Sequence, residues 1–199
     1  MKPVIEAAFG DILTLNADAI MCSAHCSFIR GSGLSGRIHK AAGKEMEEEC
    51  IRIRDNIYGK GNFAPGGDSI ITSAYKLPCC KYVIHSAIPR YFTLPYEHRD
   101  EIKLTEYARC YTTALEIANE HHLKTVGFPC AGMTIYRWPP DVAPALAVDA
   151  VFRFIPRNES VQEIMFVCPH PEWVQIYTKL IDEEEQKYKK SKTGVISGL

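Results

Sequence analysis

The sequence predicts an α/β domain with a largely parallel central sheet. Short apolar runs alternate with longer amphipathic stretches along the 199 residues, and this alternation is typical of parallel strands joined by helices. Hydrophobic residues make up 46% of the chain and charged residues 24%, which is an ordinary globular composition. We expect a single domain over residues 1–188 and a flexible tail over residues 189–199.

The first part of the chain predicts two strands followed by two helices. Val4–Phe9 is an apolar run, and Asp18–Cys22 is a mostly apolar run that leads into a turn-rich segment, so both are predicted to be strands. Gly36–Gly43 and Glu45–Arg54 are predicted to be helices. Because ligands of such folds bind beyond the carboxyl ends of strands, the segment after Cys22 is a candidate binding loop.

The middle of the chain predicts two short strands and a long helix. Ser69–Thr72 and Tyr82–His85 are short and β-branched or aromatic, which favours strands. Glu101–Glu120 carries apolar residues at helical spacing. These residues are Leu104, Tyr107, Ala108, Tyr111, Leu115 and Ala118.

The last part predicts two more strands, each followed by a helix. Lys124–Pro129 is a strand that ends at a proline, and Ile164–Val167 is the final strand. Asp141–Phe154 is predicted to be a helix because Pro139 and Pro140 stand just before it. Trp173–Tyr188 is the last predicted helix, and the lysines that follow suit the negative end of its dipole.

Charge and hydropathy exclude several classes of protein. Lys and Arg number 23 and Asp and Glu 24, a net charge of −1, so the basic surplus typical of nonspecific nucleic-acid binding is missing. No apolar stretch approaches the roughly 20 residues needed to span a bilayer. The start Met1-Lys2-Pro3-Val4 turns polar at Glu6 and does not resemble a signal peptide. We expect a cytoplasmic protein without membrane contact, and the sequence does not indicate its oligomeric state.

Eight cysteines and seven histidines are the unusual part of the composition. In a cytosolic protein the thiols are expected to be reduced, and no pair of CxxC knuckles is present for structural zinc. We therefore expect most of the cysteines to be buried small apolar residues, with no metal and no cofactor. The alternative is a metal or thiol site formed by Cys22, His25 and Cys26, which crowd on one short loop.

Two glycine-containing segments are candidate ligand loops. Gly31-Ser32-Gly33-Leu34-Ser35-Gly36 precedes a predicted helix, so its backbone amides and the helix N-terminus could approach a phosphate. Ordinary turns also contain glycine clusters, and no Gly-Lys-Ser/Thr of a P-loop follows. Phe128–Pro139 joins a predicted strand to a helix, and Tyr136 or Trp138 in it could stack on a sugar or base or could pack in the core.

A third candidate is Gly10-Asp11-Ile12, which follows the first predicted strand. The Asp11 carboxylate could accept a hydrogen bond from the amino group of adenine. An aspartate at this place could equally cap a turn or a helix.

The order of these motifs resembles the macro domain, an ADP-ribose-recognising family, from about Val4 to Tyr188. Gly10-Asp11-Ile12 matches the family's adenine motif, and the glycine loop runs into Ile38-His39-Lys40-Ala41-Ala42-Gly43 as in family members. The resemblance extends through further segments in the family's order. These are Ala17–Ile20, Gly66–Thr72, Tyr75–Pro78, Tyr82–His85, Phe128-Pro129 and Ile135-Tyr136. It implies a three-layer α/β/α sandwich around a mixed, largely parallel sheet.

The sequence departs from the family where the distal ribose and the diphosphate would bind. Cys22-Ser23-Ala24-His25 stands in place of Asn-Ala-Ala-Asn, and Ser35 stands where many hydrolases of the family have an acid. In the second loop, Thr134 and Arg137 replace the two glycines of Ser-Thr-Gly-Ile-Tyr-Gly. Arg137 could offset part of this loss because a guanidinium binds phosphate directly.

The resemblance implies binding of ADP-ribose, or of an ADP-ribosyl group on a protein or small molecule. The alternative is a mono-ADP-ribosyl hydrolase in which Cys22, His25 or His39 contributes to catalysis. The expected ligand-binding residues come from the adenine motif and the two loops. They are Asp11, Ile12, Gly31, Ser32, Gly33, Leu34, Ser35, Gly132, Met133, Thr134, Ile135, Tyr136 and Arg137.

Overall fold

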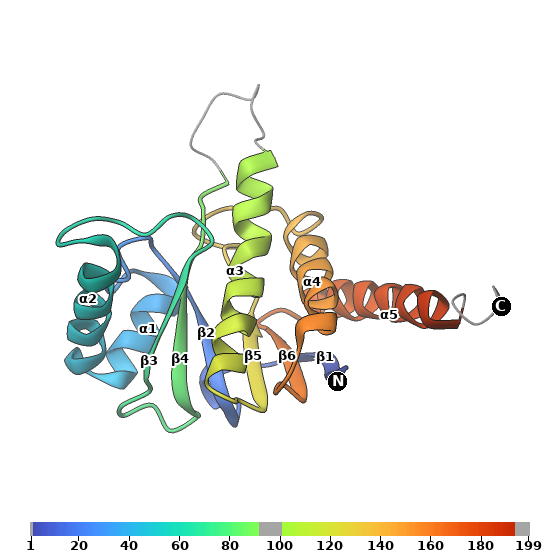
Figure 1. Cartoon of the computed structure of the whole chain (residues 1–199), viewed down its shortest axis with the longest axis horizontal. Helices are drawn as coiled ribbons and strands as arrows, with labels where there is room; N and C mark the ends of the chain where they lie inside the picture. Colours follow the sequence, from blue (N-terminus) through green and yellow to red (C-terminus); the bar gives the residue numbers. More distant parts are fainter. Residues whose placement is uncertain (1, 92–100, 194–199) are drawn as a thin grey trace.

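The computed structural model describes residues 2–91 and 101–193 and shows one six-stranded sheet in the order β1-β6-β5-β2-β4-β3 (Figure 1). Every neighbouring pair is parallel except β3 and β4, which are antiparallel. The mixed, largely parallel sheet that the sequence predicts is therefore confirmed. The strands are β1 (Val4–Phe9), β2 (Ala17–Ala24), β3 (Ser69–Ser73), β4 (Cys80–Ala87), β5 (Thr125–Pro129) and β6 (Glu163–Cys168).

Within the described residues, five α-helices cover the two faces of the sheet, as expected for a three-layer sandwich (Figure 1). Helices α3, α4 and α5 pack in one hydrophobic cluster, and α1 and α2 pack in another. The helices are α1 (Gly33–Ala42), α2 (Lys44–Tyr58), α3 (Glu101–Glu120), α4 (Ala143–Phe154) and α5 (Pro171–Thr193). A short 3₁₀ helix, η1 (Ile12–Thr14), follows β1, and another, η2 (Ile155–Arg157), follows α4.

Several predicted helix boundaries differ from the structure, and the start of α1 is the one that matters for the site. Helix α1 begins at Gly33 instead of Gly36, so the glycine loop itself forms the first turn of the helix. Helix α5 continues to Thr193, beyond the expected end at Tyr188, and i,i+4 ion pairs such as Lys189–Glu185 extend into this part. Residues 194–199 of the expected tail lie outside the described residues.

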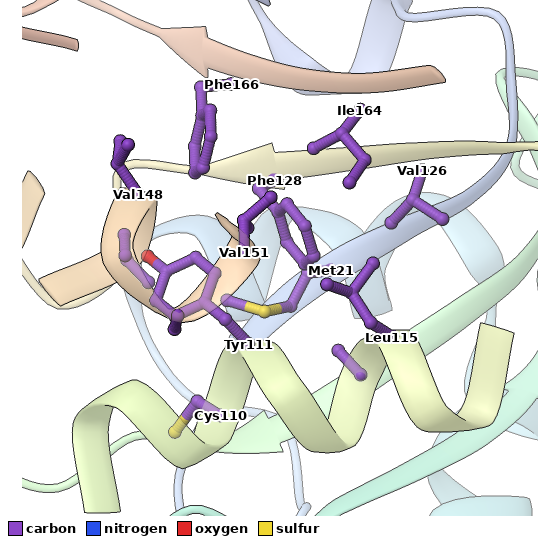
Figure 2. Packing of buried hydrophobic residues seen from close by; sticks show 14 of the residues in the cluster. Met21, Cys110, Tyr111, Leu115, Val126, Phe128, Val148, Val151, Ile164 and Phe166 are labelled. Carbon is purple, nitrogen blue, oxygen red and sulfur yellow. The ribbon is translucent and has the colours of Figure 1, made fainter. Parts of the chain in front are cut away.

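The larger core lies between the sheet and α3, α4 and α5. Figure 2 shows Tyr111 and Leu115 of α3 pointing toward Phe128 of β5, and Phe166 of β6 lying beside Phe128. The rings of Phe128 and Phe166 are 5.7 Å apart, and Tyr111 meets Phe128 edge-on at 5.1 Å. Packing of this kind anchors β5 and β6, and the loops that leave their carboxyl ends therefore start from fixed positions.

The order of the strands places a crevice between β2 and β5. The chain leaves β2 toward α1, α2, β3 and β4 on one side of the sheet, and it leaves β5 toward α4 and β6 on the other. Because the connections after β2 and β5 run in opposite directions along the sheet, a crevice opens between them at the carboxyl ends of the strands. Ligands of open α/β sheets bind in such crevices. The glycine loop follows β2 and the second candidate loop follows β5, so both border this crevice. No described helix is long and apolar enough to cross a bilayer.

Candidate functional site

Two adjoining hollows form one cleft at the carboxyl ends of the strands. The first has a volume of about 600 Å³ and is lined by β1, η1 and the start of α5, and the second has about 340 Å³ and lies beside the end of β2. Leu34, Pro129, Cys130 and Thr134 line both hollows, so they mark the junction. Each volume lies within the range of small-molecule sites, roughly 300 to 1,000 Å³.

The glycine loop presents the N-terminus of α1 at this junction. The first backbone N–H groups of a helix have no partner within the helix and carry partial positive charge. Gly31 N donates to Ser35 Oγ at 3.4 Å, which folds the loop back onto the helix. A Cβ at Gly36 would lie 2.5 Å from the Gly31 carbonyl oxygen, so only glycine at position 36 allows this conformation of the loop. The arrangement is a ready binding site for an anion.

The second loop approaches the glycine loop from β5. Thr134, Ile135 and Tyr136 line the cleft, whereas Met133 is buried against the core and Arg137 is exposed outside the lining residues. Arg137 has φ of 56°, a left-handed conformation that favours glycine. Position 137 therefore keeps the backbone of a glycine although an arginine occupies it. Trp138 packs in the core, and its indole N–H donates to the Pro89 carbonyl oxygen at 2.7 Å.

Asp11 occupies the floor of the larger hollow and also caps η1. Its Oδ1 accepts a hydrogen bond from Leu13 N at 3.1 Å, and its Oδ2 pairs with Arg37 of α1. Partial burial alone would raise the pKa of Asp11, but the hydrogen bonds from Arg37 and Leu13 outweigh it and lower the pKa. The carboxylate is thus ionised at neutral pH, the capping role of Asp11 is confirmed, and its role as an adenine acceptor stays a prediction.

The cleft carries more positive than negative charge. Arg30 and Arg90 line the smaller hollow and Arg37 the larger one, and Asp11 is the one carboxylate among the described lining residues. Arg90 also lies over the Tyr136 ring, with its guanidinium carbon 5.9 Å from the ring centroid. In a chain of net charge −1, this local excess of arginine and the N-terminus of α1 favour a phosphate-containing ligand.

Aromatic side chains stand at both ends of the cleft. Phe9 and Trp173 line the larger hollow beside Asp11, and Phe63 lines the smaller one. Phe9 is 65% exposed and Phe63 62% exposed, so each offers an open ring face or edge to a ligand. Phe63 meets the His25 ring edge-on, with centroids 5.8 Å apart.

His25 faces the smaller hollow and belongs to a small polar cluster. Its Nδ1 lies 2.8 Å from Ser27 Oγ, and its Nε2 lies 3.5 Å from Cys26 Sγ. Burial and the nearby charge of Arg90 lower the pKa of His25, so its imidazole is neutral at pH 7. Burial raises the pKa of Cys26, which leaves the sulfur as a protonated thiol. The pair is in contact, but it is not a thiolate–imidazolium pair.

Cys22 and His39, the other two candidate catalytic residues, do not line the cleft. Both are buried beneath it, with exposures of 0% and 3%. Burial raises the pKa of the Cys22 thiol to about 12, so this sulfur is a poor nucleophile. Cys22, His25 and Cys26 also fail to converge on one point in the described structure, because Cys22 points into the core toward His39 and His85.

Comparison with known proteins identifies the family. A sequence profile of the macro domain matches residues 22–147, more than half of the chain. The chain belongs to the macro domain family. The resemblance deduced from the order of the motifs is confirmed, and so is the three-layer fold that it implies.

Relatives of this macro domain extend over nearly its full length. A macro domain-containing protein of Acinetobacter is 37% identical over 86% of the chain and 88% of the relative. A protein of Enterobacter cloacae named O-acetyl-ADP-ribose deacetylase is 33% identical over 94% of the chain and 98% of the relative. Among solved structures, the Oceanobacillus iheyensis macrodomain with ADP superposes with a TM-score of 0.82 at 28% identity and covers 92% of each chain.

The structure brings most of the predicted ligand-binding residues of this macro domain to one cleft. Lining positions are held by Asp11, Ile12, Gly31, Ser32, Gly33, Leu34, Ser35, Gly132, Thr134, Ile135 and Tyr136. Met133 and Arg137 lie outside this set, Met133 because its side chain turns into the core. Residues that the sequence did not single out include Phe9, Phe63, Arg90 and Trp173. They lie at the end of β1, after α2, after β4 and at the start of α5, and the order of the strands in the sheet brings these places together.

Proposed function

We propose that this macro domain binds ADP-ribose, either free or as the ADP-ribosyl group of a modified protein or small molecule. The observation that carries the proposal is the position of the α1 N-terminus, which lies between two hollows that differ in their linings. ADP-ribose has the same layout, with a diphosphate between adenosine and a second ribose. The names of the Enterobacter cloacae relative and of the Oceanobacillus iheyensis macrodomain with ADP support this ligand class.

The larger hollow suits adenosine. Phe9 and Trp173 provide aromatic surface for stacking, which is worth roughly 1–3 kcal/mol per base. Asp11 provides an ionised acceptor for the 6-amino group, provided that Arg37 shares its carboxylate with the base. An acceptor of this kind selects adenine over bases that present a carbonyl at the same position.

The junction suits the diphosphate. The backbone N–H groups of Gly33, Leu34 and Ser35 in the first turn of α1 have no helical partner. Thr134 adds a hydroxyl from the opposite loop, and the arginines of the cleft balance the negative charge. The smaller hollow then receives the distal ribose beside His25, Ser23 and Tyr136.

Hydrolysis is the second candidate function, favoured by the relative named O-acetyl-ADP-ribose deacetylase and by the position of His25. Ser27 N donates to His25 Nδ1 at 3.2 Å, so the neutral imidazole carries its proton on Nε2 and can donate a hydrogen bond that positions water or a ribose oxygen at this end of the cleft. Incubation with O-acetyl-ADP-ribose and with a mono-ADP-ribosylated protein tests this candidate. Release of product by the wild-type chain and its loss in His25→Gln are expected, and unchanged substrate at high protein concentration would refute hydrolysis.

A crystal soaked with ADP-ribose tests the binding proposal residue by residue. We expect adenine between Phe9 and Trp173, the diphosphate at the N-terminus of α1 and the distal ribose beside His25. Ligand density outside the cleft, or a reversed orientation with adenine against Phe63, would contradict the assignment.

We also propose a cytoplasmic location, because all eight cysteines are free thiols and such thiols stay reduced there.

A further inference from the structure

Beneath the cleft, one cysteine and two histidines from three different elements converge in the core of this macro domain. Cys22 lies on β2, His39 on α1 and His85 on β4, and all three side chains are buried. One possible ligand atom from each residue lies within 4.8 Å of the other two. Among the residues that the structure describes, this is the group of Cys, His, Asp or Glu donors that meets such a spacing.

The register of the sheet explains part of this convergence. Cys22 and His85 are opposite one another on the neighbouring parallel strands β2 and β4, so their side chains point to the same face of the sheet. Helix α1 covers that face and places the His39 ring 5.4 Å from the His85 ring. The three donors are therefore held by rigid elements instead of by a single loop.

Three of the four histidine nitrogens in this cluster lack hydrogen-bond partners. Both nitrogens of His39 and the Nδ1 of His85 are buried and unsatisfied. Leaving a buried polar group without a partner costs roughly 1–3 kcal/mol, so three unsatisfied nitrogens within one small cluster call for an explanation.

The neighbours of His85 determine which of its nitrogens is free. Thr72 Oγ1 donates its one hydrogen to the Ser73 carbonyl oxygen at 3.1 Å, and it lies 3.0 Å from His85 Nε2. With its hydrogen directed at the Ser73 carbonyl oxygen, Thr72 Oγ1 accepts a hydrogen bond from His85 Nε2–H, and we assign this tautomer. In this tautomer His85 Nδ1 carries an unshared lone pair, as a metal ligand does, and the Nε2–H···Thr72 bond fixes the orientation of the ring.

We propose that Cys22, His39 and His85 form a structural site for a soft divalent cation, with zinc as the best match. Thiolate sulfur and neutral imidazole nitrogen are the donors that zinc prefers in proteins. Cys50 of α2 lies 3.5 Å from His85 Nε2, the nitrogen that faces Thr72, and it is not one of the three converging donors. The site differs from the loop combination of Cys22, His25 and Cys26 considered from the sequence, and it goes beyond the proposed ADP-ribose function.

The site would connect the cleft to the core. Ser23, the residue after Cys22, lines the cleft, and His39 lies on the helix whose N-terminus faces the ligand. When zinc binds, the Cys22 thiol gives its proton to solvent and the thiolate bonds to the ion. A bound ion stabilises the folded state because the unfolded chain does not hold the three donors together.

Metal analysis of the whole purified chain tests the site. The protein is first stripped with a chelator and loaded with Zn²⁺, and it is then desalted and analysed for zinc and for thermal unfolding. We expect one zinc ion per chain and a rise in Tm of several degrees. The Cys22→Ser and His39→Gln variants should lose both effects. The matched control Cys79→Ser removes another buried thiol of the same core, whose sulfur contacts Cys80 instead of a histidine, and it should retain zinc.

Loading the wild-type chain with Co²⁺ provides a readout that needs no variant. Tetrahedral Co²⁺ with a thiolate ligand gives visible d–d bands and a sulfur-to-metal charge-transfer band, and we expect both. Wild-type protein that retains no more zinc than Cys22→Ser, or that shows only the spectrum of octahedral Co²⁺, would overturn the proposal. Zinc retention in a chain that fails to bind ADP-ribose would still support this site, so the two proposals can fail separately.

Discussion

Gly33 at the start of α1 and Ile135 in the loop after β5 touch at the junction of the two hollows. A Cβ at Gly33 would lie 2.6 Å from Ile135 Cδ1, and Gly33 has φ of 61°. The two loops that border the cleft are thus in direct contact where the diphosphate of the proposed ligand would lie. Glycine at position 33 is required both by the backbone conformation and by the approach of Ile135.

Ile135→Ala should weaken the binding of ADP-ribose by roughly fivefold. The change removes apolar surface that covers the junction, and partial burial of a side chain of this size is worth about 1 kcal/mol. Calorimetry measures the change in Kd. The matched control is Ile57→Ala, which shortens an equally exposed isoleucine on α2 outside the cleft. Equal affinities for Ile135→Ala and wild type would show that the contact between the loops does not cover the ligand.

Substitutions of the two exposed phenylalanines should show which end of the ligand each of them contacts. Phe9→Ala should weaken both ADP and ADP-ribose by roughly tenfold or more, because stacking on adenine is worth about 1–3 kcal/mol. Phe63→Ala should weaken ADP-ribose but leave ADP unchanged, because ADP lacks the distal ribose that would lie in the smaller hollow. The comparison is made by calorimetry with both ligands. The opposite pattern, with Phe63→Ala weakening ADP, would reverse the orientation of the ligand.

Asp11→Asn should reduce discrimination between adenine and hypoxanthine. The wild-type carboxylate accepts from the 6-amino group of ADP-ribose, whereas the inosine analogue presents a carbonyl oxygen, and a hydrogen bond to a charged group is worth roughly 1.5–3 kcal/mol. Binding of the two ligands to wild type, Asp11→Asn and the exposed control Asp141→Asn measures the ratio. If Asp11 acts only as the cap of η1, the ratio of the two affinities will be the same in all three proteins.

Asp18 should make the fold sensitive to acid. Its Oδ2 accepts from Lys124 N at 2.8 Å and Thr125 N at 3.1 Å, and its Oδ1 pairs with Lys81. Partial burial raises the pKa of Asp18, but the hydrogen bonds from Lys81 and the two backbone N–H groups outweigh it and lower the pKa.

A lowered pKa in the folded state gives stability that is fully present above the unfolded pKa of about 3.9. This stability is lost as the pH falls through the lower pKa of the folded chain. Asp18→Asn should therefore be less stable than wild type at pH 7, by roughly 1–2 kcal/mol, and the difference should shrink below pH 4. Urea denaturation across this range measures it, and a difference that grows toward acid pH would contradict the assignment.

Arg137→Gly should stabilise the chain by roughly 1 kcal/mol. The left-handed conformation costs a residue with a Cβ about 1–2 kcal/mol, and the greater flexibility of unfolded glycine offsets part of the gain. His122, with φ of 53° outside the cleft, provides a matched second site, and His122→Gly should gain similarly. The affinity for ADP-ribose should fall less in Arg137→Gly than in Arg90→Gln, because Arg90 lines the cleft and Arg137 does not.

Local patterns in the sequence were sufficient to predict the α/β class and the largely parallel sheet, whereas the three-layer sandwich followed from the resemblance to the macro domain. The helical spacing of Tyr107, Tyr111 and Leu115 predicts the buried face of α3, because the apolar side of an amphipathic helix packs against the core. The runs at Val4–Phe9 and Glu101–Glu120 match β1 and α3 residue for residue. The sequence predicts the start of α1 three residues too late, because glycines at positions 33 and 36 are typical of a loop, whereas Gly33 is the first residue of the helix.

The site was only partly predictable, because convergence across the sheet leaves no local signal. Asp11 and the glycine loop are visible in short motifs, but Phe63 and Arg90 enter the cleft from elements far away in the sequence. In the same way, the sequence places Cys22 close to His25 and Cys26. The partners that it meets in the structure are His39 and His85, 17 and 63 residues further along the chain. Pairing of β2 with β4 brings His85 to Cys22, and the packing of α1 on the sheet adds His39; the local sequence pattern indicates neither contact.

Calorimetric titration of the folded wild-type chain with ADP-ribose is the most direct test of the central claim. We predict saturable binding of one ADP-ribose per chain. ADP should bind more weakly because it lacks the distal ribose, and ribose 5-phosphate should bind more weakly still because it lacks adenine. The absence of heat with ADP-ribose and with ADP, in a sample that unfolds cooperatively, would contradict the claim that this cleft binds ADP-ribose.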